Sequence, residues 1–136
     1  MGVTYAVRNI MTEEIVRLPA TATLIKAMQL MVAKEIGSVV AVQGDRMVGI
    51  LTERDVLKCF CEDRHCGDRR IQDVMSSPLI TIDGAAAIGQ AADMMATGKI
   101  RRLMVTEAGV IQGIITERDL MRATLDVFVK LSDAWL

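Results

Sequence analysis

The tetrapeptide Thr-Glu-Arg-Asp occurs twice in this chain and contains the groups best suited to ligand chemistry. The copies lie at residues 52–55 and 116–119, an offset of 64 residues. Each copy follows an apolar run that begins with a glycine, Gly49 or Gly113, and leads into an apolar-periodic stretch. This order predicts a buried strand that passes directly into a helix at both places.

The start of a helix can bind a phosphate, because its first amides are unpaired and lie at the positive end of the helix dipole. A threonine hydroxyl can join these amides, and an aspartate one turn later can accept hydrogen bonds from both hydroxyls of a ribose. The same Thr-x-x-Asp spacing is close to a capping box, in which the two side chains serve to close the helix end. The motif by itself leaves both interpretations open.

The similarity between the two halves of the chain extends beyond the tetrapeptide and needs no gap. Residues of identical type recur at the same offset of 64, in the pairs Met11 and Met75, Ala22 and Ala86, Ala27 and Ala91, Met31 and Met95, and Ile36 and Ile100. We therefore expect an internal duplication, with repeat one and an N-terminal segment in 1–66 and repeat two with a helical C-terminal extension in 67–136. A single copy of about 60 residues would bury little apolar surface alone. Two copies packed sheet to sheet about an approximate two-fold axis would leave two related clefts for ligands.

Apolar periodicity assigns each repeat the order β-α-β-β-α, which gives an α/β (α+β) fold. The first repeat is expected to contain a strand at 15–18 stopped by Pro19, a helix capped by Thr21 or Thr23 with Leu24, Ala27, Met28 and Met31 on one face, strands at 39–42 and 47–51, and a helix from Thr52. The second is expected to contain a strand at 79–82, a helix with Ile88, Ala91, Ala92 and Met95 on one face, strands at 103–105 and 110–115, and a helix from Thr116. A short helical spacing precedes each series, at Val7, Ile10 and Met11 and at Ile71, Val74 and Met75.

Composition narrows the class of protein. With 51% hydrophobic and 24% charged residues, the chain is typical of a globular protein. A net charge of −1 and 3% aromatic residues argue against a nucleic-acid partner, which favours basic surfaces and stacking platforms. No apolar run approaches the about 18 residues of a membrane span, and the N-terminus lacks the pattern of a secretory signal. We therefore expect a cytoplasmic protein without a membrane partner.

The ordered motifs together resemble a tandem pair of CBS domains, the regulatory Bateman module, over about residues 7–125. The family pattern of glycine, apolar, any, Thr or Ser, any, any, Asp is met by 49–55 and 113–119. Its strand signature, which ends in proline, is met at Pro19, whereas the second copy ends in Asp83. Its basic pair before the central strand is met by Arg101-Arg102, and Gly37-Ser38 stands there in the first copy.

The resemblance implies a sensor of an adenosine ligand: AMP, ADP, ATP, a dinucleotide such as NAD, or S-adenosylmethionine. Each family site commonly joins the Thr and Asp of one repeat to the first strand of the other. One site is then expected to comprise Thr12, Ile15, Val16, Pro19, Arg101, Arg102, Ile114, Thr116, Arg118 and Asp119. The other is expected to comprise Ser38, Thr52, Arg54, Asp55, Ser76, Leu79 and Ile80.

The two expected sites differ in charge. Arg101 and Arg102 are available for phosphate at the Asp119 site alone, which we therefore expect to be the tighter one. The Asp55 site is expected to be weak, empty or suited to a less charged ligand. The alternative interpretation of the two arginines is a solvated charged edge.

A cluster of Cys59, Cys61, His65 and Cys66 contains four possible metal ligands. Its spacing matches no common zinc pattern, and three crowded cysteines do not resemble a disulfide framework. On a helix, Cys59 and Cys61 project about 200° apart, and Cys61 follows Leu57 by four residues on the expected apolar face. We therefore expect free thiols and no metal, with a metal or redox sensor as the alternative.

The C-terminal helix carries large apolar residues at intervals of three and four: Met121, Leu125, Phe128, Leu131 and Trp135. They either pack back onto their own domain or form a dimer contact. The resemblance favours a homodimer, because modules of this family commonly pair. No catalytic set of residues is arranged by the duplication, so the chain is expected to be no enzyme, to need no catalytic cofactor, and to regulate an unidentified protein in trans. The alternative is a structural or protein-interaction module with empty clefts.

Overall fold

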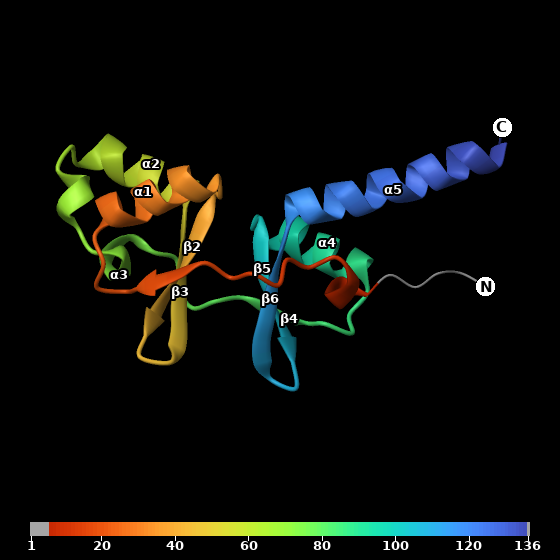
Figure 1. Cartoon of the computed structure of the whole chain (residues 1–136), viewed down its shortest axis with the longest axis horizontal. Helices are drawn as coiled ribbons and strands as arrows, with labels where there is room; N and C mark the ends of the chain where they lie inside the picture. Colours follow the sequence, from red (N-terminus) through yellow and green to blue (C-terminus); the bar gives the residue numbers. More distant parts are fainter. Residues whose placement is uncertain (1–5, 136) are drawn as a thin grey trace. The chain divides into compact units, whose positions relative to one another are not determined.

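The computed structural model describes residues 6–135 (Figure 1). For residues 133–135 it describes the backbone but not the side chains. Its first series of elements is η1 (Val7–Asn9), β1 (Arg17–Pro19), α1 (Leu24–Lys34), β2 (Ser38–Gln43), β3 (Arg46–Thr52) and α2 (Glu53–Glu62). A short helix η2 (Cys66–Asp68) leads into the second series: α3 (Ile71–Val74), β4 (Thr81–Asp83), α4 (Ile88–Gly98), β5 (Arg102–Glu107), β6 (Val110–Thr116) and α5 (Glu117–Trp135). The order β-α-β-β-α predicted for each repeat is therefore confirmed.

The chain packs as two compact units that do not coincide with the two repeats of the sequence. The central unit is Ile15–Leu79, and the terminal unit consists of the described residues on either side, 6–14 and 80–135. The segment around η1 therefore belongs with the second series of strands, where the Val7 amide donates to the Ala86 carbonyl at 2.8 Å. In the same way, α3 packs within the central unit. The expected boundary between residues 66 and 67 separates the two repeats of the sequence, whereas the two units are defined by which residues pack together.

Each unit contains one three-stranded sheet, ordered β1-β2-β3 in the central unit and β4-β5-β6 in the terminal unit. The first two strands of each sheet are parallel, because a helix crosses over between them, and the last two form an antiparallel pair. Val40 pairs with Ile50, and Met104 pairs with Ile114. Both sheets also shift register at the same point, at Ala41/Val42 and at Val105/Thr106. The duplication is therefore preserved down to the register of individual pairs.

The crossover helices bury the face that the sequence predicts, with one exception. Thr23 caps α1, its hydroxyl accepting from the Lys26 amide at 3.3 Å. The buried residues are Leu24, Ala27 and Met31 in α1 and Ala91 and Met95 in α4. The expectation for Ala92 is wrong, because Ala92 is exposed and Met94 packs against the core instead.

Each unit has its own apolar core. The buried cluster of the central unit is Ala20, Leu24, Ala27, Ala41, Leu51, Cys59, Cys66 and Ile71. That of the terminal unit is Val7, Ile82, Ala91, Met95, Leu103, Val105 and Ile115. The terminal core includes Val7, and Arg8 next to it donates to Glu107 with Nε at 2.7 Å and Nη2 at 3.1 Å, a contact that raises the pKa of Arg8. Within residues 6–135, no helix combines the length and apolarity needed to cross a bilayer.

Helix α5 is nearly twice as long as α2, with 19 residues against 10, and it carries exposed apolar side chains in both halves. The exposed fractions are 63% for Met121, 58% for Leu125, 69% for Phe128 and 55% for Leu131. The alternative in which these four residues pack back onto their own domain is therefore wrong. The side chain of Trp135, which was expected to join them, lies outside the described residues.

Candidate ligand-binding half-sites

Both Thr-Glu-Arg-Asp copies form capping boxes. At the start of α2, the Thr52 hydroxyl accepts from the Asp55 amide at 3.2 Å, and Asp55 Oδ2 accepts from the Thr52 amide at 3.0 Å. At the start of α5, the equivalent distances are 3.3 Å and 2.8 Å for Thr116 and Asp119. The capping interpretation is confirmed, and it fixes both aspartates at a helix N-terminus. The cap occupies one oxygen of each carboxylate, so the second oxygen is the more accessible acceptor for another donor.

The two aspartates differ at that second oxygen. Asp55 Oδ1 accepts from the Ser76 hydroxyl at 3.2 Å, and this hydroxyl also lies 3.4 Å from Oδ2. The Asp119 carboxylate instead accepts from the Thr116 hydroxyl at 3.1 Å and from the Thr116 amide, both at Oδ2. Among residues 6–135, all hydrogen bonds of the Asp119 carboxylate fall on Oδ2. The half-buried Asp119 therefore keeps Oδ1 for another donor, whereas Asp55 has both oxygens engaged.

A segment from outside the sheet lies beside each capping box. In the terminal unit, Thr12 pairs with Ile114 through amide-to-carbonyl bonds of 2.8 and 2.9 Å. In the central unit, Ser76 pairs with Ile50 through bonds of 2.9 and 3.0 Å. Thr12 and Ser76 occupy equivalent positions of the duplication. The structure thus brings each of these predicted site residues to the unit that holds its expected aspartate.

Two equivalent glycines allow these segments to approach the sheet. A Cβ atom on Gly113 would lie 2.6 Å from Met11 Sδ and 2.9 Å from the Thr12 carbonyl oxygen. A Cβ atom on Gly49 would collide with the side chain of Met75. Cβ atoms in proteins do not approach other atoms this closely, so a residue with a Cβ would not fit at Gly49 or Gly113 without a shift of its neighbours. This explains why the pattern before Thr-Glu-Arg-Asp begins with glycine.

The cationic residues of the predicted site lie next to the terminal capping box. The Arg101 carbonyl accepts from the Glu117 amide at 3.1 Å, and its exposed Nε lies 3.9 Å from Glu117 Oε2. Arg102 follows as the half-buried first residue of β5. At the equivalent place in the central unit, the Gly37 carbonyl accepts from the Glu53 amide at 3.0 Å and Ser38 begins β2. Positive charge at this position is therefore confined to the terminal unit.

The remaining predicted site residues are divided between the units. Arg54 and Arg118 are the exposed second residues of α2 and α5. Leu79 belongs to the central unit with Asp55, whereas Ile80 belongs to the terminal unit. The residues expected to complete the Asp119 site from the other repeat lie in the central unit, and their part in that site stays a prediction: Ile15, Val16 and Pro19.

The expectation of three free thiols is wrong, because Cys59 and Cys66 form a disulfide with their Cα atoms 6.0 Å apart. Cys59 and Cys66 are buried, whereas Cys61 is a free, exposed cysteine. The apolar face of α2 was also misplaced: Leu57 is 67% exposed, and Cys59 lies on the buried side. The bridge forms because the chain turns back after Glu62, so that η2 brings Cys66 against Cys59.

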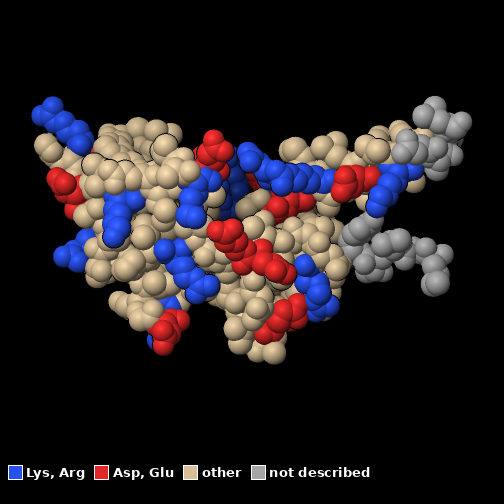
Figure 2. Space-filling view, viewed as in Figure 1, with Lys and Arg blue, Asp and Glu red and all other residues tan. Residues whose placement is uncertain are grey.

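No group of three or more His, Cys, Asp or Glu residues in the described part of the chain could hold a metal ion. Charged side chains of both signs alternate over the face shown in Figure 2 and do not gather into one basic patch there. That distribution is consistent with the net charge of −1.

Two units with the same strand order, register and helix cap define a tandem-repeat α/β module. The model of the CBS-domain family matches residues 7–62 and 71–126. The chain therefore belongs to the CBS-domain family, and its two domains form a pair. CBS-domain pairs are regulatory and ligand-binding modules.

Several known proteins are similar to this chain over most of its length. An uncharacterized protein of Methanopyrus kandleri is 31% identical over 120 residues, which are 86% of this chain and 61% of the relative. The chain thus spans less than two thirds of that relative's length. A CBS-domain protein from Agrobacterium tumefaciens has a TM-score of 0.85 at 23% identity, over 90% of this chain and 96% of that one. The CBS domain pair of protein MJ0100, solved with 5′-methylthioadenosine and S-adenosyl-L-methionine, has a TM-score of 0.80 at 19% identity, over 90% of this chain and 97% of that one.

Proposed function

We propose that this chain is a regulatory module that senses an adenosine-containing ligand and acts on a partner protein in trans. The observation that carries the proposal is the Asp119 carboxylate, which is fixed by the cap of α5 and keeps Oδ1 for a ribose hydroxyl. The adjacent helix N-terminus and the arginine pair suit a phosphate or another anionic group. The adenosine ligands bound to the MJ0100 pair support the same ligand class.

The half-site of Asp119 is the tighter of the two in this proposal. Asp55 Oδ1 already accepts a hydrogen bond from Ser76, which competes with a sugar hydroxyl, whereas Asp119 Oδ1 accepts none among residues 6–135. The central unit also has Gly37 and Ser38 in place of the arginines. The competing hydroxyl and the missing cations both lower the affinity for a nucleotide.

A thermal-shift screen with AMP, ADP, ATP, NAD and S-adenosylmethionine tests the ligand class. A ligand that binds only the folded state stabilises it by about 2.7 kcal/mol at a hundredfold excess over Kd. We expect at least one adenosine compound to raise the Tm by several degrees, and GTP as the matched control to raise it less. No shift with any of the five compounds would contradict the proposal and favour a module with empty clefts.

We further propose that the chain forms a homodimer through the exposed face of α5. Four large apolar side chains on one helix are more than half exposed, an arrangement that favours burial against a second copy. Two such helices can pack along their apolar faces and remove these side chains from water.

Replacing both Leu125 and Phe128 with glutamate is expected to convert the dimer to a monomer in sedimentation velocity. Both residues are exposed in the described chain, so the fold of each unit should survive. Val110→Glu is the matched control, because Val110 is 58% exposed on β6 and should leave the dimer intact. Truncation after Thr124 should act like the double substitution. An unchanged dimer in these variants would show that α5 is not the interface.

A further inference from the structure

The disulfide of the central unit has no counterpart in the terminal unit. The positions equivalent to Cys59 and Cys66, 64 residues later, are Ala123 and Lys130, and both lie within the continuous helix α5. In the central unit α2 stops at Glu62, and the chain turns back to form η2. The bridge therefore exists only where the chain turns back on itself.

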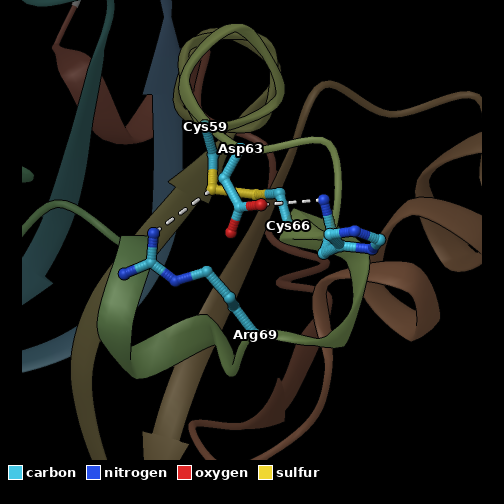
Figure 3. Close-up of a disulfide and its surroundings, with 5 residues drawn as sticks. Cys59, Asp63, Cys66 and Arg69 are labelled. Atoms are coloured by element: carbon cyan, nitrogen blue, oxygen red, sulfur yellow. Dashed lines mark hydrogen bonds between the residues drawn. A yellow bond between two sulfur atoms is a disulfide. The ribbon is translucent and has the colours of Figure 1, made fainter.

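The bridge joins the end of α2 to the start of η2 (Figure 3). Cys59 lies in the last turn of α2, and Cys66 is the first residue of η2, seven residues later. Between them, Asp63 turns the chain: its amide donates to the Cys59 carbonyl at 2.9 Å, and its Oδ1 accepts from the His65 amide at 2.9 Å. Arg69 reaches back so that its Nη1 lies 3.7 Å from Cys59 Sγ.

The segment that follows the bridge leads to the half-site. The Arg69 carbonyl accepts from the Leu24 amide at 2.9 Å, and the Ile71 amide donates to the Ala22 carbonyl at 2.8 Å. Five residues after Ile71, the hydroxyl of Ser76 donates to Asp55 at the start of α2. Helix α2 is thus held at its first turn by Ser76 and at its last turn by the disulfide, and both restraints belong to the segment 66–76.

We propose that Cys59 and Cys66 form a thiol–disulfide switch that sets the order of α2 and of segment 66–76, and through them the affinity of the Asp55 half-site. The reductant is a dithiol. When the segment around the bridge opens transiently, one thiolate of the dithiol attacks a bridge sulfur and forms a mixed disulfide with it. The original S–S bond breaks, and the released cysteine thiolate takes a proton. Its second thiol then displaces the other cysteine, so that the dithiol becomes a disulfide and the protein gains two thiols. Reduction removes a cross-link from the core and loosens both segments.

The affinity part of this proposal rests on the proposed nucleotide function, whereas the change in order does not. The first experiment therefore measures the change in order alone. Hydrogen exchange is followed by mass spectrometry on the full chain, with and without dithiothreitol. Amides in 56–76 should exchange about tenfold or more faster after reduction, and amides in β6 and the first turns of α5 should be unchanged. Thiol titration in denaturant should give one reactive thiol before reduction, from Cys61, and three after it, since the chain has three cysteines.

Cys66→Ser should reproduce the reduced state, whereas Cys61→Ser should behave as the wild type and remain sensitive to dithiothreitol. If Cys66→Ser does not fold, the reduced wild type supplies the same comparison. Three reactive thiols in protein kept under oxidising conditions, or equal exchange in both states, would overturn the switch. Calorimetry with the nucleotide selected in the thermal screen should show a change of threefold or more in affinity at the central half-site, with the terminal half-site unchanged. Equal affinity in both states would overturn the coupling to the half-site, and a protein that binds no nucleotide would still show the exchange difference.

Discussion

Replacing Asp119 with alanine is expected to weaken adenosine-nucleotide binding by about ten- to a hundredfold. The substitution removes a hydrogen bond between a sugar hydroxyl and a charged acceptor, an interaction of about 1.5–3 kcal/mol. We propose that the terminal half-site is the tighter of the two, so its loss should dominate an isothermal titration. The measurement uses the nucleotide with the largest thermal shift on the wild-type protein.

The matched control is Asp55→Ala, which removes the same capping box in the other repeat. Both substitutions should lower the stability of a helix start by about 1 kcal/mol, so a difference between them in binding reports on the ligand and not on the cap. Asp55→Ala should leave the tighter binding event within about threefold of the wild type. Equal losses in the two variants would contradict the proposed ranking of the half-sites.

Replacing Gly113 with alanine is expected to lower the free energy of unfolding by about 1–3 kcal/mol, the usual cost of overpacking. The added Cβ would lie 2.9 Å from the Thr12 carbonyl oxygen, which is fixed by its pairing with Ile114. The segment before Ile15 would then have to move away from β6, and Thr12 would leave the terminal half-site. Urea unfolding measures the first effect, and the nucleotide affinity measures the second.

Gly49→Ala provides the comparison for this prediction. The three atoms nearest to its added Cβ all belong to the Met75 side chain, which can change rotamer, whereas one of the three nearest to a Cβ on Gly113 is a backbone oxygen. We therefore expect Gly49→Ala to be the less destabilising substitution, and to leave Thr12 in place. A Gly113→Ala variant as stable as the wild type would show that the close approach of Met11 and Thr12 to β6 is not maintained in solution.

The order of elements and both capping boxes could be predicted from the sequence because they depend on neighbouring residues. Apolar periodicity defines the helices and strands, and Thr-x-x-Asp is read within one turn of helix. The duplication added longer-range information, because it placed Thr12 and Ser76 at equivalent positions. In the structure they pair with Ile114 and Ile50, in the units that hold their expected aspartates. The same ordered motifs indicated the CBS-domain family, and the family model matches residues 7–62 and 71–126.

Contacts that depend on how the chain reverses could not be predicted in this way. The Cys59–Cys66 bridge needs α2 to stop at Glu62 and the next residues to turn back, and neither event has a clear periodic signal. The hydrogen bond from Ser76 to Asp55 joins residues 21 positions apart, and it distinguishes two half-sites whose Thr-Glu-Arg-Asp motifs are identical. Ala92 is exposed because of the way α4 packs against its sheet, and the spacing of apolar residues alone does not reveal this.

The role of the Asp119 carboxylate is tested most directly by titrating the wild type and Asp119→Ala with AMP and with 2′,3′-dideoxy-AMP, or with the same pair built on whichever adenosine compound the screen selects. In the wild type, the dideoxy compound should bind about ten- to a hundredfold more weakly, because the aspartate loses the sugar hydroxyls. In Asp119→Ala, the two compounds should bind equally, since the acceptor is already absent. Equal affinities for the two compounds in the wild type would contradict the account, because the sugar would then not be held by this residue.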